Sequence, residues 1–249
     1  MTTGRVRKEP PPFRRASVVA TESVSPWMTR VVVSGKQLEG FSIESPASSV
    51  RLLLPTETDL EIPTWAGNEF LLADGSRPTI RTLTPRRFDS DRLELALDIV
   101  HHNGGVLTPW AQAARAGKAP DVAISGPGRG QTIDADASGF VLIGDETAIP
   151  AICQLLESLP RVPIQTFVAI RHEDGRVDLH RSADERWPVV ESSRDLGDIA
   201  VRHLASTNLT EGTHIWAAGE AASMQKIRKH LFTDREFPRN HTTIRGYWK

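Results

Sequence analysis

The sequence predicts two consecutive domains, an antiparallel β-barrel followed by an α/β domain built on a parallel sheet. Three observations predict this class. The first 130 residues contain short strand-like segments separated by Pro, Gly, Ser and Asp. The later residues alternate apolar strands with helical segments, and the change of rhythm falls within residues 131–138. We expect the first domain over residues 1–134 and the second over residues 135–249.

Composition narrows the classes of function. The 249 residues are 39% hydrophobic and 24% charged, which suits a globular protein with a buried core. Thirty basic residues against 31 acidic ones argue against a general nucleic-acid binder. No apolar run is long enough for a membrane helix, and the first residues lack the apolar segment of a signal peptide. Because Cys153 is the single cysteine, no internal disulfide can form, and we expect a cytoplasmic protein.

Five strands and one helix are expected in the first domain. The strands are residues 15–20, 30–34, 50–54, 79–84 and 92–100. In the last of these, Leu or Ile occupies every second position from 93 to 99, and Glu94 and Asp98 lie on the opposite face. This alternation predicts a half-buried strand. The helix covers residues 109–116 and is closed by Gly117, in the position favoured for a helix C-cap.

The second domain is expected to alternate strands and helices. Residues 140–143 form a continuous apolar run ending at Gly144, as in a strand buried on both faces. Helices are expected at residues 147–159 and 220–232, and the second has acid at its start and base at its end, which matches the helix dipole. The remaining strands are residues 163–170, 213–218 and 242–245. Residues 172–200 are polar and show no clear period, so no element is assigned there.

The first candidate site ends the strand at residues 79–84. Alternation places Arg81 and Leu83 on one face and Thr82 and Thr84 on the other. An arginine can hold a pyrophosphate through two parallel hydrogen bonds, and Thr84 can hydrogen-bond the edge of a flavin ring. The alternative is an exposed strand end with three solvated arginines.

The second candidate site joins the clearest strand to the helix of the first domain. Its members are His102, Gly105, Val106, Leu107 and Thr108. The glycine lets the backbone approach a ligand, and Thr108 followed by proline suits a helix N-cap. Free amides at a helix start bind anions, although a capped helix after a glycine-rich turn is the alternative. His101 and His102 are not expected to share a metal, because adjacent strand residues point to opposite faces.

The third candidate site follows the buried strand directly and opens a helix. Its members are Gly144, Asp145, Glu146, Thr147 and Ala148. Gly219 and Glu220 repeat the same change from strand to helix. Open α/β sheets bind ligands at these positions. The Gly-x-Gly-x-x-Gly pattern of many dinucleotide sites is absent from this segment.

Taken in order and spacing, these motifs resemble the siderophore-interacting, or ferric-siderophore reductase, family of flavoproteins. The resemblance extends from about Arg15 to Lys249. It rests on residues 81–84, 102–111, 125–127, 144–152, 218–220 and 246–248. Each segment is weak evidence alone, whereas six segments in this order are specific.

The resemblance implies a ferredoxin-reductase-like fold, with an FAD-binding barrel and a nicotinamide-binding second domain. Arg81, Leu83, Thr84 and His102 would then lie at the flavin and its phosphate. The turn of Gly105, Val106, Leu107 and Thr108 would hold the pyrophosphate through backbone amides. Residues 144–148, with Gly219 and Glu220, would receive NADPH or NADH.

Leu83 departs from the family pattern, which usually has an aromatic residue, commonly Tyr, at this position. A leucine can pack on a flavin face, but it cannot stack on the ring or donate a hydroxyl hydrogen bond. The departure implies weaker binding of FAD or a shifted reduction potential.

The resemblance also implies the reaction: hydride passes from NAD(P)H to FAD, and single electrons then reduce siderophore-bound Fe(III) to Fe(II). No side chain is expected to act as a catalyst or as a metal ligand, because the cofactors carry the chemistry and the siderophore holds the iron. The residues expected at the anionic ferric siderophore are Arg51, Arg129, Trp248 and Lys249.

We expect a monomer that does not bind nucleic acid and does not insert into a membrane. Two alternatives stay open. One is a ferredoxin-reductase-like flavoprotein that exchanges electrons with a ferredoxin or another protein partner. The other is a non-catalytic protein that binds siderophore or flavin.

Overall fold

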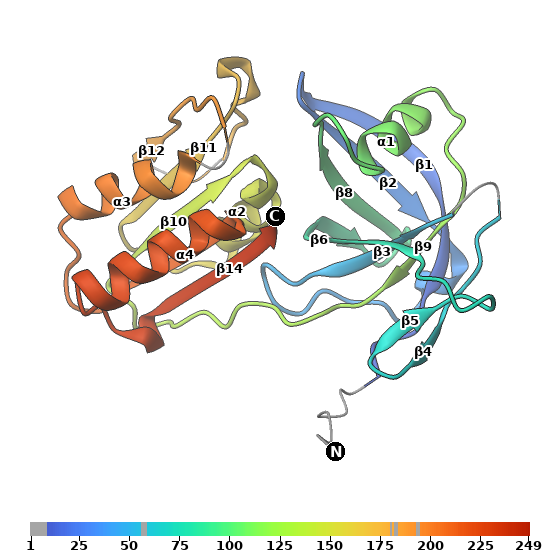
Figure 1. Cartoon of the computed structure of the whole chain (residues 1–249), viewed down its shortest axis with the longest axis horizontal. Helices are drawn as coiled ribbons and strands as arrows, with labels where there is room; N and C mark the ends of the chain where they lie inside the picture. Colours follow the sequence, from blue (N-terminus) through green and yellow to red (C-terminus); the bar gives the residue numbers. More distant parts are fainter. Residues whose placement is uncertain (1–8, 56–58, 180, 182–183, 193–194) are drawn as a thin grey trace. The chain divides into compact units, whose positions relative to one another are not determined.

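The structure is a computed structural model that describes residues 9–55, 59–179, 181, 184–192 and 195–249. The chain divides into two compact units. The first comprises the chain up to Ser23 together with Thr29–Gln131, and the second comprises Val24–Met28 and Thr132–Lys249. The first unit is built on an antiparallel sheet and the second on a parallel sheet with helices, so the predicted fold class is confirmed (Figure 1).

A seven-stranded sheet forms the first unit, in the order β6-β3-β9-β1-β2-β8-β7. The strands are β1 (Arg14–Ser25), β2 (Met28–Ser34), β3 (Val50–Leu54), β6 (Thr79–Leu83), β7 (Pro85–Asp89), β8 (Glu94–Val100) and β9 (Val122–Ser125). Strand β3 pairs antiparallel with β6 and β9, β1 with β9, and β7 with β8. The two edge strands, β6 and β7, are separated in the chain only by Thr84. The sheet must therefore curl until its edges approach each other, which gives the predicted barrel.

Apolar side chains fill the inside of this barrel. They come from the strands and from α1 (Leu107–Arg115), which presents Trp110, Ala111 and Ala114 at helical spacing. Short elements outside the large sheet are η1 (Lys36–Leu38) and the hairpin of β4 (Thr64–Ala66) and β5 (Glu69–Leu71). Helix α1 begins at Leu107, two residues before the predicted start.

Asp98 of β8 is buried, so the prediction of a solvent-facing acidic side for this strand is wrong. Arg30 of the neighbouring strand β2 donates to it twice, from Nε to Oδ1 at 2.7 Å and from Nη2 to Oδ2 at 3.0 Å. Two parallel hydrogen bonds neutralise the carboxylate, which makes its burial tolerable. Leu93, predicted within the strand, precedes it with a φ of 53°.

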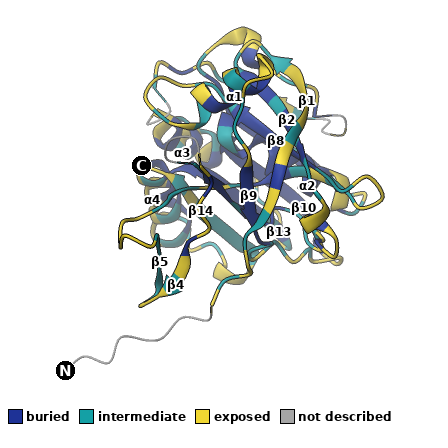
Figure 2. Cartoon of the chain, turned by 90° about the vertical axis from the view of Figure 1, so that its right-hand side faces the viewer, coloured by how far each residue is buried: buried dark blue, intermediate teal, exposed yellow. Residues whose placement is uncertain are grey.

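A five-stranded parallel sheet forms the second unit, in the order β12-β11-β10-β13-β14. Its strands are β10 (Gly139–Asp145), β11 (Ile164–Ala169), β12 (Asp184–Arg186), β13 (Thr213–Glu220) and β14 (Thr242–Trp248). Figure 2 shows the central strands β10 and β13 in the colour of buried residues along most of their length. Two buried faces account for the continuous apolar run that the sequence carries here.

Helices cover both faces of this sheet. Val141 and Ile143 of β10 lie in the apolar cluster beneath α3 (Leu196–Ser206) and α4 (Ala221–Lys229). Gly144 faces the other side, because a Cβ built on it would lie 2.5 Å from the Cβ of Ala148, at the start of α2 (Ile149–Ser158). In Figure 1, α3 and α4 lie side by side on the face opposite α2.

Several boundaries differ from the prediction. The helix expected at residues 147–159 begins as a 3-10 turn, η2 (Glu146–Ala148), before α2. The helix expected at residues 220–232 ends at Lys229 and continues as the π-helical turn η5 (His230–Asp234). The final strand runs on to Trp248. The unassigned residues 172–200 contain η3 (Glu173–Gly175), β12 and the start of α3, while residues 180, 182, 183, 193 and 194 lie outside the described residues.

The Arg30–Asp98 pair makes the barrel sensitive to one substitution. We predict that Asp98→Ala lowers the free energy of unfolding by about 3 kcal/mol, because it leaves a partly buried guanidinium without its main partner. In the same strand, Glu94 pairs with the exposed Arg92, so Glu94→Ala should cost less than about 1 kcal/mol. Urea unfolding of both variants measures the difference. Equal losses of unfolding free energy in the two variants would contradict the conclusion that the buried Arg30–Asp98 pair stabilises the barrel more than the exposed pair does.

Candidate functional site

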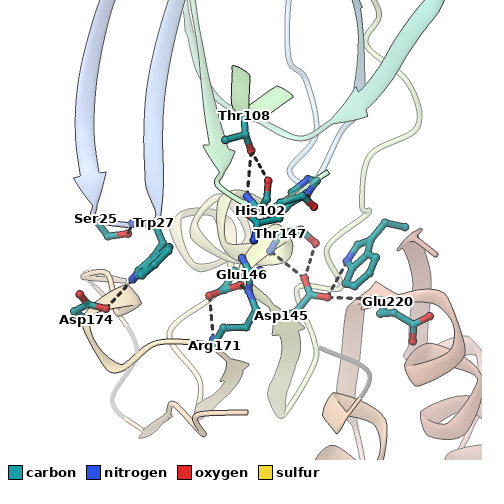
Figure 3. A network of polar contacts seen from close by, with 12 residues as sticks. Ser25, Trp27, His102, Thr108, Asp145, Glu146, Thr147, Arg171, Asp174 and Glu220 are labelled. Carbon is teal, nitrogen blue, oxygen red and sulfur yellow. Dashed lines mark hydrogen bonds and ion pairs between the residues drawn. The ribbon is translucent and has the colours of Figure 1, made fainter. Parts of the chain in front are cut away.

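Asp145 ends β10 and joins the carboxyl ends of three parallel strands. Its Oδ1 accepts hydrogen bonds from the backbone N and from the hydroxyl of Thr147, at 2.9 and 2.5 Å. Its Oδ2 accepts from the backbone N of Glu220, at the end of β13, and from the indole Nε1 of Trp248, at the end of β14, both at 3.0 Å. Figure 3 shows the carboxylate between Thr147 and Glu220. Four donors therefore converge on one side chain.

The carboxylate of Asp145 is almost completely buried, at 2% exposure. Burial raises the pKa of this carboxyl above its usual value, and the hydrogen bonds from Thr147, Trp248 and Glu220 oppose that rise. The donors thus compensate a charge that the protein interior disfavours. Their number explains how an acid can occupy this position without a positively charged partner.

Gly219 gives the Asp145 carboxylate its space. A Cβ at this position would lie 2.6 Å from Asp145 Oδ2, and the φ of 154° is one that other residues rarely adopt. The glycine at the end of β13 is therefore required by the packing of an acidic side chain from β10.

Glu220 caps helix α4. Its carboxylate accepts hydrogen bonds from the backbone N of Ala222 at 2.9 Å and of Ser223 at 2.7 Å. The acid predicted at the start of this helix is therefore its N-cap. Because the side chain is buried, contact with a nucleotide at this position would have to use the backbone.

Glu146 reaches across the same edge of the sheet to Arg171, which follows β11. Its Oε1 accepts from the backbone N of Arg171 at 3.0 Å, and its Oε2 accepts from Nε at 2.9 Å (Figure 3). Nearby, the Trp27 ring stacks on His172 with centroids 3.7 Å apart, and its Nε1 donates to Asp174 at 2.8 Å. The ends of β10, β11, β13 and β14 are thus all linked by side chains.

The start of α1 differs from the prediction. Val106 occupies the N-cap position and no side chain caps the helix, so the N-cap predicted for Thr108 is wrong. The Thr108 hydroxyl instead closes the preceding turn, accepting from the backbone N of His102 and donating to its carbonyl, both at 3.1 Å (Figure 3). The His102 ring lies over Gly105, 2.6 Å from where a Cβ would stand.

The first candidate site divides between surface and core. Arg81 is exposed, and its guanidinium donates to the carbonyl of Ile80 at 2.9 Å. Leu83 is partly buried and packs against the apolar core of the barrel, while Thr84 is buried. A leucine at position 83 therefore has a packing role in this chain in addition to any contact with a flavin.

The four residues expected at the ferric substrate lie in different units. Arg51, on β3, holds its guanidinium 5.9 Å from the centre of the Phe70 ring, and Arg129 is exposed on the loop after β9. Both belong to the first unit, whereas Trp248 and Lys249 belong to the second. Trp248, expected at the substrate, is an exposed residue at 37%, and its indole Nε1 also donates to Asp145.

Sequence reasoning missed the link between Asp145 and Trp248, which are 103 positions apart. It also gave no role to Trp27 or to the pairing of Glu146 with Arg171. An acid directly after a buried apolar run was the available signal, because such an acid needs partners from neighbouring strands.

Within the described residues, no group of three or more His, Cys, Asp or Glu side chains is placed to hold a metal ion. None of the described helices is long and apolar enough to cross a membrane.

The antiparallel barrel and the parallel sheet define the class of ferredoxin-reductase-like folds. Phthalate dioxygenase reductase shares this fold with a TM-score of 0.59 at 13% identity, over 94% of this chain and 68% of that one. Residues 17–131 match the siderophore-interacting FAD-binding domain, and residues 137–249 match the siderophore-interacting protein model. The chain belongs to the siderophore-interacting protein family.

Relatives match almost the whole chain. An uncharacterized protein of Mycobacterium tuberculosis is 31% identical over 96% of this chain and 90% of that protein. The NADPH-dependent ferric-chelate reductase of Escherichia coli is 23% identical over 95% of this chain and 92% of that protein. The crystal structure of a siderophore utilization protein from T. fusca superposes with a TM-score of 0.83 at 28% identity, over 97% of this chain and 94% of that one.

The Asp145 contacts generate a testable prediction. Asp145→Asn should lower the free energy of unfolding by about 2 kcal/mol, because an amide NH₂ would face two of the four buried donors. The Trp248 indole proton should also shift in an amide NMR spectrum, with Trp248→Phe used to assign its signal.

Asp198→Asn is the matched control, because this exposed carboxylate pairs with the partly exposed Lys226, and its replacement should change neither quantity strongly. An Asp145→Asn variant with wild-type stability and an unmoved Trp248 signal would contradict the assignment.

Proposed function

We propose that this protein is a ferric-siderophore reductase that binds FAD and takes hydride from a nicotinamide dinucleotide. The observation that carries the proposal is the strand order β12-β11-β10-β13-β14. From the central strand β10 the chain builds β11 and β12 on one side, and it then crosses to build β13 and β14 on the other side. The point where the strand order reverses, the switch point, therefore falls between β10 and β13. Ligands of open α/β sheets bind outside the carboxyl ends of the strands at such a point.

The first unit has a start of α1 that fits the pyrophosphate of FAD. No side chain caps this helix, its first turn holds no acidic residue, and the turn of Gly104 and Gly105 precedes it. Backbone N–H groups at a helix start favour an anion. Arg81 adds an exposed positive charge to the same unit. These features support FAD, which has a pyrophosphate, over FMN, which has a single phosphate.

In the second unit, the residues around the switch point hold the nucleotide site in place and do not take part in the reaction. Asp145 fixes the ends of β10, β13 and β14, and Glu220 fixes the start of α4. Both carboxylates are fully engaged, so the nucleotide would meet backbone groups and a rigid edge. FAD, when bound, supplies the change from a two-electron hydride to single electrons. One dinucleotide then reduces two ferric ions and releases one proton.

The substrate is proposed as an anionic ferric siderophore. Chelating oxygens already surround the ferric ion, so the protein needs only to attract and orient the complex. Arg51 and Arg129 in the first unit and Lys249 in the second supply positive charge for this purpose. Fe(II) has a lower charge and weaker affinity for oxygen ligands, which favours its release. The relatives named as ferric reductases support the same substrate class.

A nicotinamide-dependent reaction and a single, buried cysteine suit the cytoplasm, where we place the protein as a monomer. A ferredoxin as electron partner is the alternative that the test below separates.

The proposal predicts a yellow protein that takes up FAD in preference to FMN. Under anaerobic conditions, NADH or NADPH should bleach the flavin absorbance, and a ferric catecholate should restore it with formation of Fe(II). The absorbance spectrum and a ferrous chelator measure both steps. Recovery of FMN alone, or a flavin that neither dinucleotide bleaches, would contradict the proposal. Bleaching followed by no reaction with ferric chelates, but by reduction of a ferredoxin, would favour the protein-partner alternative.

A further inference from the structure

Arg171 stands where dinucleotide-binding sheets distinguish their two cofactors. It follows β11, the strand next to the central β10. In sheets of this order, an acid after the second strand hydrogen-bonds the ribose 2′-hydroxyl of NADH, and an arginine there accommodates the 2′-phosphate of NADPH. By residue type alone, Arg171 would indicate NADPH.

The charge of Arg171 is already neutralised by Glu146. Both the backbone N and the Nε of Arg171 donate to this carboxylate, at 3.0 and 2.9 Å. The side chain of Glu146 is only 6% exposed. Removing its partner would leave a buried carboxylate without compensation, so the pair resists separation by a ligand.

The other arginines of the same segment are engaged as well. Arg176 pairs with Glu173 at 2.7 Å, and Arg181 donates to the carbonyl oxygens of Leu159 at 2.6 Å and of Pro160 at 2.9 Å. Asp174 adds a further exposed carboxylate. Around the end of β11 there are therefore two arginines, at 171 and 176, and three carboxylates, those of Glu146, Glu173 and Asp174.

We propose that the hydride donor is NADH rather than NADPH, and that Glu146 sets this choice by neutralising Arg171. A 2′-phosphate would add negative charge around the end of β11, where three carboxylates already outnumber two arginines. A 2′-hydroxyl is neutral and can donate a hydrogen bond to the exposed carboxylate of Glu173 or Asp174. The inference rests on the proposed use of a nicotinamide dinucleotide and adds its identity.

Two measurements on the full-length protein test the inference. The first is anaerobic reduction of the bound flavin, where kcat/KM for NADH should exceed that for NADPH by about tenfold or more. The second is calorimetric binding of the nucleotide fragments 5′-AMP and 2′,5′-ADP, which needs no redox chemistry. The 2′-phosphate should give no gain in affinity.

Glu146→Gln keeps the size and one acceptor of the side chain but removes its charge. It should raise the NADPH-to-NADH ratio of kcat/KM about fivefold or more and should make 2′,5′-ADP bind more tightly than 5′-AMP. Glu173→Gln, at an exposed position, provides a second variant that does not disturb a buried pair, and it should raise the ratio about threefold. Glu211→Gln is the control, because Glu211 is exposed and precedes β13 at the opposite end of the strands.

Equal or better use of NADPH by the wild type would overturn the inference, as would tight binding of 2′,5′-ADP that Arg171→Ala abolishes. An unchanged ratio in both glutamate variants would also overturn it. Failure of the proposed function has a different signature: 5′-AMP binds in preference to 2′,5′-ADP, but neither dinucleotide reduces the flavin.

Discussion

The buried carboxylate of Asp145 is the interaction on which the second unit depends. Three strand ends meet at this side chain, through the backbone of Thr147 and Glu220 and the indole of Trp248. A charge in this position is unfavourable in itself, and four donors are needed to offset the loss of water. The requirement is reciprocal, because the same hydrogen bonds hold the donors in place. A rigid edge at the switch point of the sheet is the result.

The barrel also contains a buried carboxylate, but it is stabilised by a different kind of partner. Asp98 is also buried, but its partner is the guanidinium of Arg30 from the adjacent strand. A charge pair across two strands stabilises a sheet locally, whereas the neutral donors around Asp145 come from three strand ends. The difference suits their positions, because backbone and indole N–H groups are available at the strand ends, whereas Asp98 lies beside a side chain of the adjacent strand. Glu146, Glu173 and Asp174 lie in the same part of the second unit, where Arg171 and Arg176 pair with the first two of them.

The two-domain fold could be predicted from local patterns because each pattern reports the burial of one element. The apolar run of β10 and the alternation in β8 identify strands with little ambiguity. Alternation failed for Asp98, since a period of two cannot show that a charged residue has a partner on the next strand. The polar residues of α3 and β12 gave no periodic signal, although both elements cover or extend the sheet.

The candidate site was predictable as a set of positions but not as a set of contacts. Gly144, Asp145 and Glu220 could be identified because they lie at the carboxyl ends of strands of a parallel sheet, where ligands bind. The contacts of Asp145 with Trp248 and of Glu146 with Arg171 depend on the strand order, which places segments far apart in the chain beside one another. The N-cap of α1 was misplaced because Thr108 hydrogen-bonds the turn before the helix.

The most direct test of this account is a crystal structure of the protein with FAD and NAD⁺ bound. The account predicts the dinucleotide across the carboxyl ends of β10 and β13, contacting backbone groups near Gly144 and Gly219. Asp145 should still bond Glu220 and Trp248 as it does here. A dinucleotide bound elsewhere on the second unit, or an Asp145 side chain turned away from these donors to contact the ligand, would contradict it.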